Sequence, residues 1–233
     1  MKEQLKELFN KYQIEYNNQQ LELLNQFFEI VVEENKKFNL TAITEKRDFA
    51  IKHLLDCALP APLLPNGAKI IDIGAGAGFP SIVLKIMRPD LEVMMLDSLN
   101  KRVNFLNETV GKLGLNNIEA VHARAEDYAL KNREKFDVTI ARAVAGLNTL
   151  CEYCLPFVKV GGVFVALKGA NYEQELAEAH NAIMLLGGEL ANVNKVFVEE
   201  IESQRANMVI NKIKPTPNKY PRGKNLPRLK PLS

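Results

Sequence analysis

The stretch KIIDIGAGAGFPSIVLKIMRPDLEVMMLDSLNKR, residues 69–102, decides the fold of this chain. An apolar run that contains Asp72 precedes three glycines within five positions, and a helical segment then leads to a second apolar run ending in Asp97. A strand, a glycine turn, a helix and a second strand form the unit from which parallel sheets are built. Because ligands bind such sheets beyond the carboxyl ends of the strands, the glycine turn predicts a small-molecule site.

Apolar runs of the same kind recur along the rest of the chain. NIEAVHA, FDVTIARA and GGVFVALKG are each bounded by turn residues, with helical segments between them. The last two runs, ELANVNKVFVEE and ANMVINKI, leave no room for a helix, so we expect them to pair antiparallel at the sheet edge. The sequence therefore predicts an α/β fold with a seven-stranded, mostly parallel sheet and an antiparallel final strand.

The two ends of the chain differ from this central part. Residues 1–62 repeat apolar side chains at helical spacing and end at the proline-rich stretch PAPLLPNG. From Lys212 onward the chain carries seven Lys or Arg, five prolines and no acid, although its overall net charge is only +2. We therefore expect a helical extension at 1–62, an α/β domain at 63–213 and a basic tail at 214–233. Prolines should keep the tail extended over the surface, with its charges free to meet a polyanion.

The glycine turn departs from a dinucleotide-binding loop. In the pattern G-x-G-x-x-G the third glycine would come one residue later, where this chain has Phe79. Gly74 and Gly76 still permit a tight turn and close backbone approach to a ligand. Asp72, next to the turn, would disfavour a pyrophosphate but suits a cationic group such as the ammonium of an amino acid.

Two further positions define the rest of the ligand. Asp97 ends the second strand and can accept hydrogen bonds from both hydroxyls of a ribose. Ala125 and Glu126 follow the third strand, where an adenine would lie. A ligand with an amino-acid end, a ribose and an adenine but no phosphate is S-adenosylmethionine. The expected fold is therefore the Rossmann-like fold of S-adenosylmethionine-dependent methyltransferases.

No general base or nucleophile is evident at the end of the fourth strand. The run FDVTIARAVAG lacks the Asn/Asp-Pro-Pro-aromatic motif of exocyclic-amine methylases, and no cysteine stands near it. We expect Cys151 and Cys154 to be packed rather than metal-binding, and the three histidines are scattered, so no metal site is expected. An acceptor with a free lone pair, such as nitrogen 7 of guanine, needs positioning more than proton transfer. The catalytic residues stay unknown.

Several motifs occur in one order along nearly the whole chain. They are NLTAIT at 39–44, HLLDC at 53–57, IDIGAGAGFP at 71–80, RAED at 124–127, ARAVA at 141–145, LKG at 167–169 and the closing TPNKYPRGKNLPRLKPL. In this set the chain closely resembles the RsmG (GidB) family of bacterial 16S rRNA guanine-N7 methyltransferases. ARAVA and the KYPR tail are more specific to that family than the glycine loop is.

The resemblance implies methyl transfer to nitrogen 7 of the guanine at position 527 of 16S rRNA, in the small ribosomal subunit. Carried over by motif, the cofactor contacts fall on Gly74, Phe79, Ala125, Glu126 and Arg142. As an exposed arginine at a strand end, Arg142 either contacts the cofactor, as the resemblance implies, or holds the RNA backbone near the target. Its replacement by alanine should strongly reduce methyl transfer and leave the melting temperature nearly unchanged. The expected RNA contacts, at the carboxyl edge of the sheet or in the tail, are Lys101, Arg102, Lys168, Arg222, Lys224 and Arg228.

Two other functions stay open at this point. One is a nicotinamide-dependent oxidoreductase, which calorimetry with the two cofactors would distinguish. The other is a non-enzymatic RNA-binding ribosome assembly factor, which would fail to transfer a methyl group to 30S particles. With three cysteines and no apolar run of about 20 residues, we expect a cytoplasmic monomer that binds neither membrane nor metal.

Overall fold

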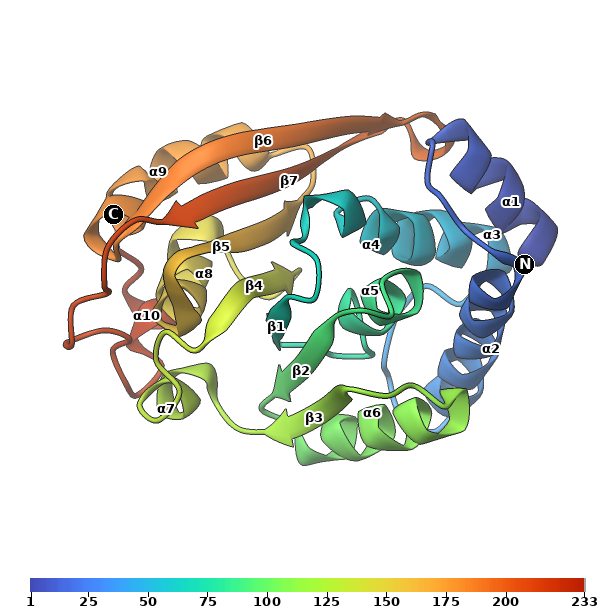
Figure 1. Cartoon of the computed structure of the whole chain (residues 1–233), viewed down its shortest axis with the longest axis horizontal. Coiled ribbons are helices and arrows are strands. Elements are labelled where there is room, and N and C mark those ends of the chain that lie inside the picture. Colours follow the sequence, from blue (N-terminus) through green and yellow to red (C-terminus); the bar gives the residue numbers. More distant parts are fainter. Residues whose placement is uncertain (233) are drawn as a thin grey trace.

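The computed structural model describes residues 1–232 and has one seven-stranded sheet with helices on both faces (Figure 1). The strand order is β3-β2-β1-β4-β5-β7-β6. The strands are β1 (Lys69–Ile73), β2 (Glu92–Asp97), β3 (Ile118–His122), β4 (Phe136–Arg142), β5 (Val158–Lys168), β6 (Gly188–Val198) and β7 (Ser203–Lys212). β7 pairs antiparallel with both β5 and β6, and the other neighbours pair parallel. The predicted α/β fold is confirmed.

Two groups of helices cover the sheet. The first group consists of α1 (Lys2–Lys11), α2 (Asn18–Asn35), α3 (Lys46–Phe49), the π-helical turn η1 (Ala50–Leu55), α4 (Asp56–Ala58), η2 (Ala61–Leu63), α5 (Ser81–Met87) and α6 (Asn100–Leu113). The second consists of α7 (Ala125–Ala129), α8 (Leu147–Cys154), η3 (Leu155–Phe157), α9 (Tyr172–Leu185) and α10 (Leu226–Leu229). Successive residues of a strand point to opposite faces, so Ile70 joins the first group's apolar cluster and Ile71 the second's.

The N-terminal helices continue the apolar cluster of the sheet. Phe27 and Phe49 are fully buried in the same cluster as Ile70 of β1. α1 also reaches the far hairpin, where the Tyr12 hydroxyl donates to Glu200 Oε2 at 2.5 Å and Lys11 Nζ lies 2.7 Å from a Glu199 carboxylate oxygen. These acids belong to η4 (Glu199–Ile201), the turn between β6 and β7. The division at residues 62 and 213 stays a prediction.

The C-terminal tail differs from the expected extended segment with free charges. Residues 226–229 form α10, which packs against α8 (Figure 1). Arg222 pairs with Glu152 of α8, whose side chain is completely buried. A buried carboxylate is stable only with a counter-charge and hydrogen bonds, so Glu152 fixes the tail against the domain.

Candidate functional site

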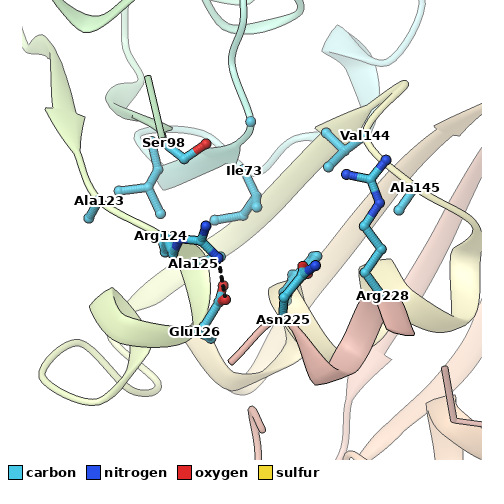
Figure 2. Close-up of a pocket in the computed structure, with 13 residues that line it drawn as sticks. Ile73, Ser98, Ala123, Arg124, Ala125, Glu126, Val144, Ala145, Asn225 and Arg228 are labelled. Atoms are coloured by element: carbon cyan, nitrogen blue, oxygen red, sulfur yellow. Dashed lines mark hydrogen bonds and ion pairs between the residues drawn. The ribbon is translucent and has the colours of Figure 1, made fainter. Parts of the chain in front are cut away.

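A cavity of about 250 Å³ opens at the carboxyl edge of the sheet. Gly74, Ala125 and Glu126 line it, so the structure brings together three of the residues expected to hold the cofactor (Figure 2). Tyr153 and Asn225 also line the cavity, and the sequence assigned neither of them to the cofactor. Tyr153 lies in an ordinary helical run, and Asn225 stands in the closing motif, which was expected to run over the surface with its charges facing RNA.

Asp72 lies behind the glycine turn with its carboxylate completely buried. Oδ2 accepts a hydrogen bond from the Ser81 hydroxyl at the start of α5, whereas Oδ1 has no hydrogen-bond partner among the described residues. Burial raises the pKa of Asp72 to about 7, although the bond from Ser81 opposes the shift. Asp72 does not line the cavity, but its neighbours Ile73 and Gly74 do, and an unpartnered buried acceptor favours a donor group nearby.

The Asp97 carboxylate accepts hydrogen bonds from two backbone turns, the glycine turn and the turn before α6. Its Oδ2 accepts from the Gly76 amide at 2.9 Å, and its Oδ1 accepts from the Leu99 amide at 2.9 Å. Arg102 Nη1 lies 3.6 Å from Oδ2. The side chain is 3% exposed, and each carboxylate oxygen keeps a second lone pair. Asp97 therefore holds the glycine turn, and its expected bonds to a ribose stay a prediction.

Five of the residues expected to contact the cofactor do not line the cavity: Asp72, Gly76, Phe79, Asp97 and Arg142. The Phe79 ring is buried and stacks on His53, with 4.3 Å between the ring centroids. A contact from Phe79 to a ligand would therefore come from its backbone. Burial, together with the charge of Arg142, lowers the pKa of His53 to about 3, so the imidazole is neutral.

Arg142 is not the exposed arginine that the sequence predicted. Its side chain is 14% exposed, and Nη1 donates to Asp56 Oδ2 at 2.9 Å and to the Lys52 carbonyl at 3.0 Å. Nη2 lies 3.0 Å from His53 Nδ1, and the guanidinium carbon lies 5.2 Å from the centre of the Phe79 ring. The helix that carries His53 and Asp56 covers the end of β4, which buries the guanidinium.

A second hollow, of about 460 Å³, lies beside the cavity and shares Val144 and Ala145 with it. Asp56 lines this hollow and is held between two arginines, because Arg205 Nε lies 3.0 Å from Oδ1 on the side opposite Arg142. Lys168 lines it as well, and its side chain is 7% exposed. Lys168 Nζ is bonded to Glu175 Oε2 at 2.6 Å and to the Ala145 carbonyl at 2.8 Å.

The residues expected to contact RNA are in different environments. Lys168 and Arg222 are engaged in the ion pairs described above, so neither charge is free. Lys101 lies over the Phe38 ring at the start of α6, and Lys224 is exposed in the tail. Arg228 is exposed as well, but it lines the cavity.

All three cysteines are free thiols in buried positions. Burial raises the pKa of both Cys151 and Cys154, which keeps them protonated and unreactive. Within residues 1–232 no group of three or more His, Cys, Asp or Glu is placed to hold a metal ion. In the same part of the chain, no helix has the length and apolar character needed to cross a bilayer.

The glycine turn allows a stability test with a matched pair. Gly74 and Gly76 both have left-handed backbones, with φ of +77° and +59°. A Cβ atom on Gly74 would lie 2.7 Å from Val144 Cγ2, whereas the nearest atom to one on Gly76 is a backbone oxygen at 3.9 Å. Gly76→Ala should therefore lower the free energy of unfolding by about 1–2 kcal/mol, from backbone strain alone. Gly74→Ala should lower it by about 1–3 kcal/mol more, because Val144 must move. Equal urea midpoints for the two variants would contradict this packing.

Comparison with known proteins assigns the family. The sequence profile described as GidB, rRNA small subunit methyltransferase G, matches residues 20–206. The ribosomal RNA small subunit methyltransferase G of Desulforamulus reducens is 45% identical, covering 98% of this chain and 97% of its own. That of Brevibacillus brevis is 47% identical and covers 99% of both chains.

Solved structures agree on the fold. The crystal structure of M. jannaschii TYW2 in complex with AdoMet has a TM-score of 0.57 at 17% identity, covering 74% of this chain and 80% of that one. At this identity the likeness shows a common Rossmann-like architecture alone. The relatives, by contrast, span nearly the full sequence, and the family profile matches most of it. The chain belongs to the rRNA small subunit methyltransferase G (GidB) family.

Proposed function

We propose that the protein transfers a methyl group from S-adenosylmethionine to nitrogen 7 of a guanine in 16S rRNA, at position 527 of the small ribosomal subunit. The observation that carries the proposal is the pair of adjoining hollows at the carboxyl edge of the sheet. One hollow takes the cofactor and the other the acceptor base, and they meet at Val144 and Ala145. Family membership favours this function over a nicotinamide-dependent oxidoreductase or an assembly factor without activity.

The residues in and behind the first hollow fit the cofactor. Gly74 of the lining lets the backbone approach closely, and Asp72, buried behind the lining, has an unpartnered oxygen for the ammonium group. Ala125 and Glu126 lie at the start of α7, where a backbone amide or the Glu126 side chain can bind the adenine edge. When bound, the cofactor supplies an electrophilic methyl group on a sulfonium.

The second hollow orients the acceptor. Nitrogen 7 of guanine carries a free lone pair, so no side chain has to remove a proton during the transfer. The ion pairs of Asp56 with Arg142 and of Lys168 with Glu175 fix the walls of the hollow. Positioning of this kind supplies on the order of 7–11 kcal/mol of a barrier. Lys101 and Lys224 are placed outside the hollows, where they can meet phosphates.

Methyl transfer to 30S particles tests the proposal directly. Particles that lack the modification are incubated with the protein and methyl-labelled cofactor, and the RNA is then digested to nucleosides. We expect the label in 7-methylguanosine, and none with particles that already carry the modification. Label in another nucleoside would contradict the assignment. We also propose that the protein acts in the cytoplasm and is a monomer. Light scattering measures its mass in solution and so checks the monomeric state.

Asp72 should make cofactor binding depend on pH. Its pKa of about 7 lies above its ordinary value of 3.8, so the free protein carries a protonated carboxyl below pH 7. An ammonium group binds the ionised form, so affinity should increase roughly tenfold from pH 5.5 to pH 7. For the same reason, the contribution of Asp72 to fold stability without ligand decreases as pH rises from about 4 to about 7.

Calorimetry across this pH range measures the effect, and Asp72→Asn is the control. The asparagine side chain cannot titrate, so any change of affinity with pH that remains in this variant comes from other groups of the protein or the cofactor. Equal slopes in the two proteins would exclude Asp72 as the partner of the ammonium group.

A further inference from the structure

The tail supplies one wall of the cofactor cavity. Asn225 and Arg228 rise from the tail on one side, and Ala125 and Glu126 face them from the other (Figure 2). Arg228 has no ion-pair partner among residues 1–232, whereas Arg124, the other arginine of the lining, lies 3.5 Å from Glu126. The guanidinium of Arg228 is therefore an unpaired cation in the lining of a cavity, and the proposed ligand of that cavity, S-adenosylmethionine, carries a carboxylate.

Three contacts hold this wall in place. Arg222 clamps the buried Glu152 carboxylate, with Nε 2.9 Å from Oε1 and Nη2 2.6 Å from Oε2, and its backbone amide donates to Oε1 at 2.7 Å. The Thr149 hydroxyl donates to the Pro227 carbonyl at 3.1 Å, in a buried position. The Tyr153 hydroxyl lies 3.4 Å from Asn225 Oδ1. Because all three anchors belong to α8, the wall is fixed to the domain on both sides of Asn225.

The position of Arg228 indicates which end of the ligand it contacts. It lines the cavity together with Val144 and Ala145, and Val144 is the residue that a Cβ on Gly74 would meet. In Figure 2 the Arg228 side chain lies beside Val144 and Ala145, which is the side of the cavity next to the glycine turn; Asp72 lies behind this turn and outside the lining. The adenine was placed at Ala125 and Glu126, across the cavity.

We propose that Arg228 binds the carboxylate of the amino-acid end of the cofactor, and that Asn225 and Arg228 make the tail part of the cofactor site. The proposal rests on the proposed function, since it takes S-adenosylmethionine as the ligand. Binding couplings are reciprocal, so a cofactor that gains affinity from the docked tail also stabilises the docked tail. The predicted role of Arg228 as an RNA contact is replaced by this one.

Two ligands that differ only in the amino-acid end test the assignment by calorimetry. Arg228→Ala should weaken S-adenosylhomocysteine about tenfold, the scale of a hydrogen bond to a charged group, and should leave methylthioadenosine, which has no carboxylate, within about twofold. Lys230→Ala removes the same charge from the same exposed segment, away from the cavity, and should affect neither ligand. Equal weakening of both ligands by Arg228→Ala, or weakening of neither, overturns the proposal.

Proteolysis gives a second readout that does not need activity. Lys224 is an exposed trypsin site within the wall, and saturating S-adenosylhomocysteine should slow cleavage after it severalfold in the wild type. Unchanged cleavage would show that the cofactor does not contact the docked tail. A wild type that binds neither ligand would instead contradict the proposed function. If Arg228→Ala binds S-adenosylhomocysteine normally but loses affinity for 30S particles, Arg228 is an RNA contact and the inference is wrong.

Discussion

Arg142→Ala is expected to lower the free energy of unfolding by about 3 kcal/mol, which is within the range for breaking a buried ion pair from one side. The guanidinium makes three hydrogen bonds, to Asp56, to the Lys52 carbonyl and to His53, and it lies over the Phe79 ring. Its loss leaves a mostly buried carboxylate with one partner instead of two. Urea unfolding measures the change as a shift of the midpoint at constant slope.

Arg205→Ala is the matched control for this prediction. Arg205 binds the other oxygen of the same Asp56 carboxylate, but within residues 1–232 its Nη1 donates only to Ser203 and a neighbouring carbonyl, and no aromatic ring lies under it. We expect it to have less than half the effect of Arg142→Ala. If both variants unfold at the wild-type midpoint, the pairing around Asp56 does not stabilise the fold. Methyl transfer should be lost in Arg142→Ala even at temperatures where the variant is folded.

Asp97→Ala is expected to weaken S-adenosylmethionine binding by about 1–3 kcal/mol, the scale of hydrogen bonds that involve a charged group. The structure adds a second effect that the sequence did not predict, because the Gly76 and Leu99 amides both lose their acceptor. The melting temperature should therefore decrease together with the affinity. Affinity is measured by calorimetry well below that temperature.

A ligand that lacks the ribose 2′-hydroxyl separates the loss of a ribose contact from the loss of support for the glycine turn. If the carboxylate binds the ribose, S-adenosylhomocysteine that lacks the 2′-hydroxyl should bind the wild type more weakly and bind Asp97→Ala about as well as the complete ligand does. If Asp97 only holds the glycine turn, removal of the hydroxyl should have the same effect in both proteins. An equal effect in both proteins would mean that Asp97 supports the glycine turn and does not contact the ribose.

The strands and the glycine turn were predictable because their signals are local. The parallel strands β1 to β4 are short apolar runs between turn residues, and the left-handed positions of the turn carry glycine. Asp72 and Asp97 were singled out for the same reason, since each stands at or next to the end of such a run, and their contacts with the cofactor stay predictions. The structure places Gly74, Ala125 and Glu126 together as the sequence predicted, because parallel strands bring their carboxyl ends to one edge.

The burial of Arg142 and the docking of the tail were not predictable in this way. Arg142 and Asp56 are 86 residues apart, and Arg222 and Glu152 are 70 residues apart. An arginine at a strand end and an arginine in a proline-rich tail both resemble solvated residues until the partner acid is known. No periodicity or composition identifies such a partner, because pairing between distant residues depends on the completed fold.

The contact between the Tyr12 hydroxyl and Glu200 has a consequence for folding during synthesis. The two residues are 188 positions apart, and chains are made at about 5–20 residues per second, so Tyr12 waits roughly 10–40 s for its partner. The rest of α1 and α2 packs on η1, α5 and α6, which are made much earlier. The end of α1 is therefore the part of the first two helices that reaches its final contacts last, when the last hairpin has left the ribosome.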